Sequence, residues 1–287
     1  MFHKVIILLA ILIPICTLSL LAEEGWAETE EFLYDVQSDN LLEVIMDVDA
    51  GEISVKPNDS DNQCLIRLTY SRDQCEARVD YKEKLNILKI ILDRQGWASK
   101  WDDNEDEHTQ AEIFLPKDVI MSLKTKVKAG EVVLDVGGLK IQEFHLSVWA
   151  GEVSVHFDEP NKIVMEYLDI NTKVGELNTS QLGNARFKKA KINGGIGEID
   201  VDLTGDLIDK AMAKIDLDIG EANIILPCDH GIRISIGGTF GFLSSKNIDS
   251  DFYKRGRYFY SENFKEADKS LSVRITPGLG ELNVDCE

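Results

Sequence analysis

Positive charge is scarce in this sequence. Its 287 residues include 31 lysines and arginines against 51 aspartates and glutamates, which gives a net charge of −20. Nucleic acid binding relies on basic residues that displace counterions from phosphates, so this balance argues against a nucleic acid partner. The same deficit disfavours docking on anionic lipid head groups. The composition fits a soluble, self-repelling surface, or one that collects cations or basic partners.

Sequence motifs for catalysis and metal binding are also missing. No Cys-x-x-Cys pair is present, so a zinc or thioredoxin-type site has no basis. The histidines are scattered, and no Gly-x-Ser-x-Gly motif provides a nucleophile. Asp102, Asn104 and Asp106 resemble part of a calcium loop, but Glu107 and Ile113 stand where an EF-hand needs Gly and Glu. We predict no catalytic residue, no metal site and no cofactor.

Long apolar runs are absent except at the N-terminus. Residues 5–21 are largely apolar, follow Lys4, and precede Ala22 and several acidic residues. This order predicts a secretory signal peptide over residues 1–22, cleaved after Ala22 or Ala27. A retained anchor is the alternative, because the run is near the lower length limit for a membrane span. We expect an exported protein, periplasmic or at the cell surface, that meets a membrane only through this segment if it stays uncleaved.

Four cysteines lie outside this segment, and an exported chain permits disulfides. Cys64 with Cys75 is the more natural local pair, and Cys228 with Cys286 would staple the C-terminal end. Free or partly paired thiols are an equal alternative, so the pairing stays open.

One short sequence motif recurs along the chain: an apolar residue, then Gly-Glu, then apolar residues at every second position. It occurs at Gly51, Gly130, Gly151, Gly175, Gly197, Gly220 and Gly280, with a degenerate copy at Gly241. From Gly130 to Gly241 the successive glycines are 21, 24, 22, 23 and 21 residues apart. A period of this length is typical of a solenoid whose repeats stack on one another.

This motif predicts a sharp bend of the backbone at each glycine. Side chains in a strand alternate between faces, so inward residues should be an even number of positions apart. The apolar residue before each glycine is three positions from the first apolar residue after it, as Ala129 is from Val132. If both face inward, the backbone must bend between them. Glycine supplies the unusual backbone angles of such a corner, and the glutamate beside it points to solvent.

These patterns predict an all-β fold, a solenoid whose coils stack in parallel with about 22 residues per coil. Residues 23–40 are expected to form an acidic linker and residues 41–287 the β-helix domain. Within it, residues 56–115 are an irregular β-rich insertion, and residues 246–270 are an aromatic capping loop. A partner-binding patch is the alternative for this last stretch, which mixes aromatic and basic residues.

Several stretches resemble a known family. Residues 214–227, 231–234 and 242–243, and the ending over 260–264, 271–275 and 278–282, are similar to the "toastrack" or "putative adhesin" family of bacterial envelope proteins. The C-terminal domain of LiaF-like cell-wall-active antibiotic response proteins has a similar order of features. The resemblance covers residues 41–287 and is best from residue 111 onward. It implies a right-handed single-stranded parallel β-helix with a role in sensing, scaffolding or adhesion at the cell envelope, and it brings no catalytic motif.

Two groups of residues are candidates for contacts. The tryptophans Trp97, Trp101 and Trp149 could stack on sugars, although packing against the solenoid is the favoured interpretation. The repeated glutamates could attract calcium, but one carboxylate per coil does not complete a shell of six to eight oxygens. We favour a solvated corner for them.

The sequence therefore predicts an exported, non-enzymatic cell-envelope protein that serves as a structural, sensing or adhesion-type interaction module. Its partner would be an envelope protein or a cell-wall glycan. The alternative is a polysaccharide-binding or polysaccharide-active β-helix, which two acids converging in a groove near Trp97 or Trp101 would favour.

Overall fold

The computed structural model describes residues 27–95, 109–237 and 243–287. The predicted signal peptide, Gly241, Trp97 and Trp101 lie outside these ranges. Within the described ranges, no helix is both long and apolar enough to cross a membrane.

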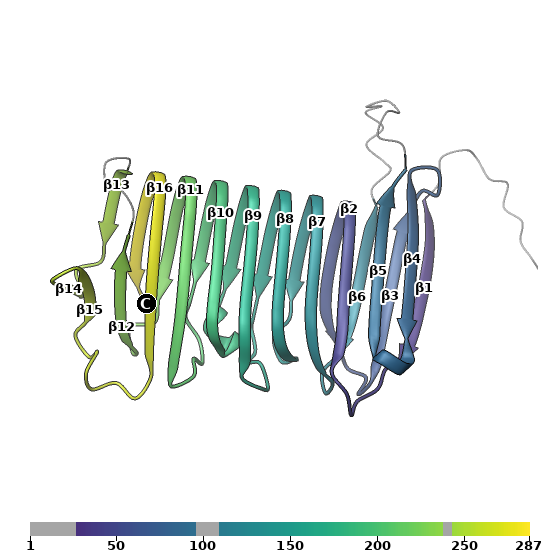
Figure 1. The fold of residues 1–287 in the computed structure, drawn as a ribbon, viewed down its shortest axis with the longest axis horizontal. Helices are drawn as coiled ribbons and strands as arrows, with labels where there is room; N and C mark the ends of the chain where they lie inside the picture. The colour runs from purple at the N-terminus through teal and green to yellow at the C-terminus, as the bar shows by residue number, and fades with distance from the viewer. Residues whose placement is uncertain (1–26, 96–108, 238–242) are drawn as a thin grey trace, which may run out of the picture.

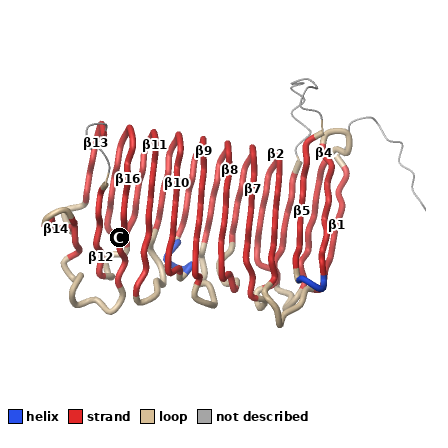
Figure 2. The backbone as a smooth tube through the Cα atoms, in the orientation of Figure 1, coloured by secondary structure: helices blue, strands red, loops and turns tan. Residues whose placement is uncertain are grey.

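Long strands dominate this part of the chain (Figures 1 and 2). They are β2 (Leu42–Asn58), β7 (Ile120–Asp135), β8 (Lys140–His156), β9 (Met165–Ser180), β10 (Phe187–Asp202), β11 (Lys210–Leu226) and β16 (Ser270–Cys286). The shorter strands are β1 (Glu28–Asp35), β3 (Gln63–Tyr70), β4 (Cys75–Lys82), β5 (Ile87–Arg94), β6 (Gln110–Pro116), β12 (Gly231–Ile236), β13 (Leu243–Ile248), β14 (Phe252–Arg255) and β15 (Tyr258–Ser261). Two short 3-10 helices, η1 (Glu83–Leu85) and η2 (Leu182–Ala185), lie at turns.

The long strands pair in parallel and in register. Gly130 is opposite Gly151, and the pairing continues through Gly175 and Gly197 to Gly220. The strands form one long sheet whose order is β2-β7-β8-β9-β10-β11-β16 along its central part. The all-β prediction and the solenoid-like stacking of parallel strands are confirmed.

Each long strand folds over at its glycine, so that its two arms face each other (Figure 1). Both arms contribute to one core: Val127 lies before the corner and Val132 and Leu134 after it, and all three are buried. Equivalent inward positions on successive strands hold Val153, Leu177 and Ile199, so the apolar side chains form continuous columns. No single strand could bury its own apolar face, which is why the strands depend on stacking.

The inward position before the corner differs from the prediction. Val174, Ile196, Ile219 and Leu279, which directly precede their glycines, are 49%, 52%, 44% and 47% exposed. The last inward residue is instead three positions before the glycine, as with Val127 and Val148. The odd step across the corner remains, but the bend begins earlier and leaves the residue before the glycine outside.

The order of strands at the C-terminal end also differs from the chain order. The last strand, β16, lies between β11 and the pair β12 and β13, so the final coils are not stacked in sequence. The first arm of β16 pairs with β12 and its second arm with β13. A disulfide between Cys228, just after β11, and Cys286 joins the ends of the two adjacent strands, with 5.4 Å between their Cα atoms.

Of the alternatives left open for Cys64 and Cys75, the structure has free thiols and not the local pair. Both cysteines are free and buried. Cys64 lies in β3, which pairs with β1 and β6, whereas Cys75 lies in β4, which pairs with β5. The two residues therefore lie in strands that are not neighbours.

The linker predicted at residues 23–40 is wrong for residues 28–35, which form β1 and pair antiparallel with β3. Phe32 and Tyr34 alternate with exposed residues and pack against the core. Arg67 of β3 pairs with Glu31 at 2.8 Å, so a neighbouring strand supplies positive charge to the acidic cluster. The sequence analysis weighed the acidic residues of this stretch and overlooked the alternation of Phe32 and Tyr34 with exposed residues, which is typical of a strand.

Residues 56–115 include β3 to β6, and residues 246–270 include β14 and β15. The strands β14 and β15 form an antiparallel hairpin, and β15 occupies the outer edge of β12. The roles expected for these segments, insertion and cap, stay predictions.

Candidate binding surfaces

The corner glycines form a column along the edge where the strands bend, which we call the bend edge. Of the eight predicted corner glycines, the seven within the described residues have φ values from 126° to 144°. A side chain at Gly151 would run into the carbonyl oxygen of Gly130, and one at Gly175 into that of Gly151. Both the backbone angle and the close stacking of neighbouring corners therefore require glycine.

A column of glutamates follows the glycines along the bend edge. Glu52, Glu131, Glu152, Glu176, Glu198, Glu221 and Glu281 occupy paired positions on successive strands. The negative charge of Asp200, with burial and the charges of Glu221 and Glu176, raises the pKa of Glu198. The carboxylates therefore repel one another, and each strand supplies one of them.

Residues that can bind metal gather at one other place in the described part of the chain. Cys228, Asp251 and Cys286 lie close together, but the two cysteines are joined in the disulfide. Their sulfurs are not thiolates, which is the form that binds metal.

The apolar residues before the glycines form a ridge beside the glutamates. We call Val174, Ile196, Ile219 and Leu279 the apolar ridge; they are in register on β9, β10, β11 and β16. Trp149, one of the predicted contact residues, directly precedes Ala150 at the same edge and is 68% exposed. Because exposed apolar side chains that lie together are typical of interaction sites, this edge is a candidate binding surface. The sequence analysis missed the ridge because it placed these residues inside.

Three carboxylates share a groove near the N-terminal end of the solenoid. Glu52, Glu112 and Glu131 line a groove of about 270 Å³. Glu52 accepts a hydrogen bond from the Gln110 side chain at 2.8 Å, and Glu112 pairs with Arg67 at 2.9 Å. Acids from neighbouring strands in one groove are part of what would favour the polysaccharide-active alternative, and the other part, Trp97 or Trp101, lies outside the described residues.

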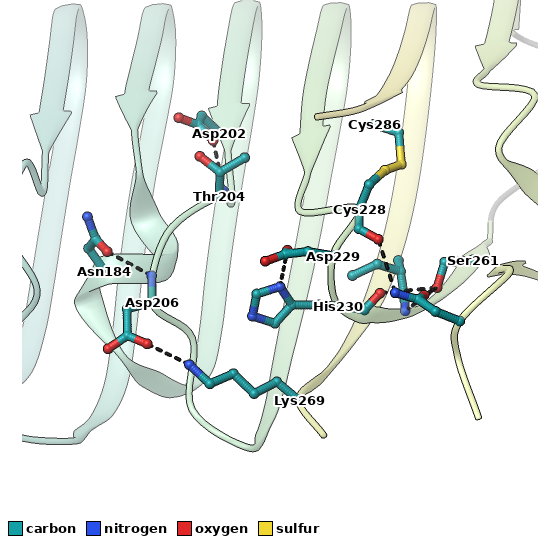
Figure 3. A network of polar contacts seen from close by, with 12 residues as sticks. Asn184, Asp202, Thr204, Asp206, Cys228, Asp229, His230, Ser261, Lys269 and Cys286 are labelled. Atoms are coloured by element: carbon teal, nitrogen blue, oxygen red, sulfur yellow. Dashed lines mark hydrogen bonds and ion pairs between the residues drawn. A yellow bond between two sulfur atoms is a disulfide. The ribbon is translucent and has the colours of Figure 1, made fainter. Parts of the chain in front are cut away.

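A polar network joins the turns near the C-terminal end (Figure 3). Lys269 pairs with Asp206 at 2.5 Å, and this contact lowers the pKa of Asp206. The buried His230 pairs through Nδ1 with Asp229, while its Nε2 has no hydrogen-bond partner within the described residues. The Ser261 hydroxyl is 3.2 Å from the backbone oxygen of His230 and accepts a hydrogen bond from the amide of Ile232. The hydroxyl also donates to Oδ1 of Asn263 at 2.7 Å. It therefore contacts the backbone and this amide and not the imidazole, and the network holds turns together.

The sequence analysis also missed a cluster of cations on the outer face of three central strands. Lys191, Lys214 and Arg274 are in register on β10, β11 and β16. Each stands six positions before its corner glycine, Gly197, Gly220 or Gly280. Aligning the repeats on their glycines would have revealed this row from the sequence.

One family model and several solved structures are similar to this chain. The family model described as the N-terminal domain of toast_rack matches residues 23–166. Among solved structures, a "putative cell adhesion protein" from Clostridium sporogenes is 14% identical, with 91% of this chain and 100% of that chain covered and a TM-score of 0.44. A "putative adhesin" from Bacteroides fragilis is 12% identical, with 90% and 97% covered and a TM-score of 0.41. No curated protein matches the chain. We draw no functional argument from structural likeness of this size.

Proposed function

The chain belongs to the toast_rack family, as the resemblance of its sequence predicts, and from this premise we propose that it is an exported, non-enzymatic interaction module of the cell envelope. We propose that its solenoid winds to the right with about 22 residues per coil. Paired glycines 21 to 24 residues apart support this coil length from β7 to β11. The right-handed preference of parallel β connections supports the handedness.

The observation that carries the interaction role is the bend edge. The apolar ridge and the glutamate column run side by side over successive strands. In each strand the ridge residue directly precedes the corner glycine and the glutamate directly follows it. A protein that only needed to fold would gain nothing from leaving Val174, Ile196, Ile219 and Leu279 in water, because burial of such side chains stabilises. The partner that best complements this edge is an envelope protein with an apolar stripe flanked by basic residues.

Envelope localisation is supported by the apolar N-terminal segment with its small residues at Ala22 and Ala27. Cell fractionation tests it: the proposal requires the protein outside the cytoplasm, and a full-length cytosolic product would contradict export.

Binding to isolated cell envelopes tests the interaction role. We expect a triple variant of the ridge, Val174→Ser, Ile196→Ser and Ile219→Ser, to bind envelopes more weakly than the unchanged protein. The matched control replaces three other exposed apolar residues, Leu33, Leu85 and Ile120, by serine. Equal retention of both triple variants would refute the bend edge as the contact surface.

The polysaccharide-active alternative has one observation in its favour, the groove of Glu52, Glu112 and Glu131. Glycoside hydrolysis uses two carboxyl groups on either side of the scissile bond. The alternative requires that purified protein release new reducing ends from a polysaccharide and that Glu131→Gln abolish this release. Absence of release from neutral and acidic polysaccharides would leave the interaction role as the better account.

A further inference from the structure

Five basic residues converge in a groove of about 430 Å³ on the outer face of the solenoid. They are Lys189, Lys191, Lys214, Arg233 and Arg274. Of the described residues that line this groove, none is an aspartate or glutamate. In a chain with 51 acidic and 31 basic residues, such a segregation of charge is the opposite of what the composition leads one to expect.

Most of these cations have no carboxylate partner. Lys214 pairs with Asp216 on its own strand. For Lys189, Lys191, Arg233 and Arg274, no ion pair forms with any residue in the described part of the chain. Elsewhere on the surface, lysines such as Lys124, Lys128 and Lys188 do pair with nearby acids. The groove therefore holds positive charge that an anionic ligand would complement.

The groove orders its cations in a row. Lys191, Lys214 and Arg274 are paired positions on three consecutive strands, so their Cα atoms follow one another at about 4.8 Å along the solenoid axis. Like charges directly opposite on neighbouring strands destabilise a sheet. A row of this kind fits a linear ligand that lies across the strands and carries several negative charges.

Aromatic and apolar side chains flank the row. Tyr167 lies at one end of the groove and Tyr258 at the other, and Met212, which is 51% exposed, lies between them. Arg233 is held in place, since it donates a hydrogen bond to the Ser272 hydroxyl at 3.1 Å and lies 5.6 Å from the centre of the Tyr258 ring. Sugar rings have apolar faces that pack on aromatic rings, whereas a bare phosphate chain has none.

We propose that this groove binds an acidic polysaccharide whose carboxylates pair with Lys191, Lys214 and Arg274 and whose sugar rings contact Tyr167 and Tyr258. The site is distinct from the bend edge, because the row lies six residues, or about 20 Å of extended strand, before the corner glycines. It adds a glycan ligand to the proposed interaction role and does not depend on the apolar ridge.

Calorimetric titration at physiological ionic strength tests the proposal. The probes are polygalacturonate as a carboxylate polymer of sugars, dextran as a neutral polymer, and inorganic polyphosphate as a polyanion without sugars. We expect polygalacturonate to bind more tightly than either of the others. Binding of dextran as tight as that of polygalacturonate, or binding of polyphosphate alone, would overturn the assignment.

Variants locate the binding. Replacing Lys191 and Arg274 together by glutamine should raise the Kd for polygalacturonate by about tenfold or more, since charge-assisted hydrogen bonds are lost. The matched control replaces Lys82 and Lys126, two exposed lysines outside the groove, by glutamine and removes the same charge. All four side chains lie on the surface, so thermal unfolding should stay unchanged in both variants. An equal loss of affinity in both variants, or in neither, would refute the groove as the site.

The triple variant of the apolar ridge separates this proposal from the proposed function. It should bind polygalacturonate as the unchanged protein does, while its binding to envelopes falls. Loss of polygalacturonate binding in the ridge variant would contradict the independence of the two surfaces.

Discussion

Replacing Gly151 by alanine is the sharpest test of the corner. Gly151 has a φ of 141°, and an added Cβ would meet the carbonyl oxygen of Gly130 on the neighbouring strand. Holding alanine at such an angle costs about 1 to 3 kcal/mol. Pushing backbone away from an added methyl group in a packed region costs another 1 to 3 kcal/mol or so. Because a neighbouring corner stacks on each side, neither strand can move without disturbing the next.

Together these effects predict a loss of about 4 kcal/mol in the free energy of unfolding, a large part of the roughly 5 to 15 kcal/mol that stabilises a folded domain. At about 2 to 4 °C per kcal/mol, the midpoint of thermal unfolding should fall by about 10 °C. Circular dichroism at the β-sheet minimum measures it directly.

Gly256 provides a matched control. It has a φ of 64°, and no heavy atom lies within 4 Å of the position its Cβ would take. Gly256→Ala therefore carries the left-handed backbone cost of about 1 to 2 kcal/mol without a clash. The lower entropy of the unfolded chain offsets about 0.5 kcal/mol of that cost. Equal midpoints for Gly151→Ala and Gly256→Ala would refute the argument from stacked corners.

Four other perturbations have expected outcomes. Burial raises the pKa of the Cys64 thiol to about 12, so this thiol should resist alkylation at pH 8 until the protein is unfolded, and rapid labelling of the native protein would contradict its burial. Removing the disulfide with serines at Cys228 and Cys286, 58 residues apart, should lower the free energy of unfolding in denaturant by about 4 kcal/mol; an unchanged midpoint would contradict this. The pKa of Glu198 is raised in the folded state, so its ionised form is unfavourable there, and Glu198→Gln should stabilise slightly at pH 7. That gain should vanish as the pH falls below the unfolded pKa, and a gain that persists in acid would have another cause. Val155→Asp should unfold the protein, because it puts an unpaired charge into a fully buried column, and unchanged thermal stability would remove Val155 from the core.

The features of the fold that repeat could be predicted from the sequence. The spacing of the glycines predicts the register, because Gly130, Gly151 and Gly175 are paired on neighbouring strands. The alternation after each glycine predicts buried residues such as Val132 and Val153. The register and the buried positions both follow from the two-residue period of a strand. This period is visible in the sequence of each repeat by itself.

The features that depend on distant pairing could not be predicted in this way. The last strand, β16, could follow the chain order and pair beyond β12, or pair with β11 as it does in the structure. The repeat pattern is the same for both positions, so it does not predict which one β16 takes. The strand β1 is stabilised by Arg67 and Arg72, which are more than thirty residues away along the chain. The exposure of Ile196 depends on how many residues before the glycine belong to the bend. Its apolar character alone indicated burial. Each of these errors concerns a contact between residues far apart in the sequence, or the exact shape of a bend, and neither can be seen in the sequence of a single repeat.

The cationic row shows why an average over composition is a poor guide to ligands of this fold. The net charge of −20 argues against a broad polyanion such as duplex nucleic acid, which would meet acidic surface on every side. At physiological ionic strength, however, charges more than about 8 Å apart are largely screened. A slender chain in the groove therefore meets Lys191, Lys214 and Arg274, and the acids beside this row are Asp169, opposite Lys191, and Asp216, paired with Lys214. Since in-register stacking places equivalent positions of successive repeats beside one another, a basic residue that recurs at one position becomes a continuous row of positive charge, whatever the charge of the whole chain.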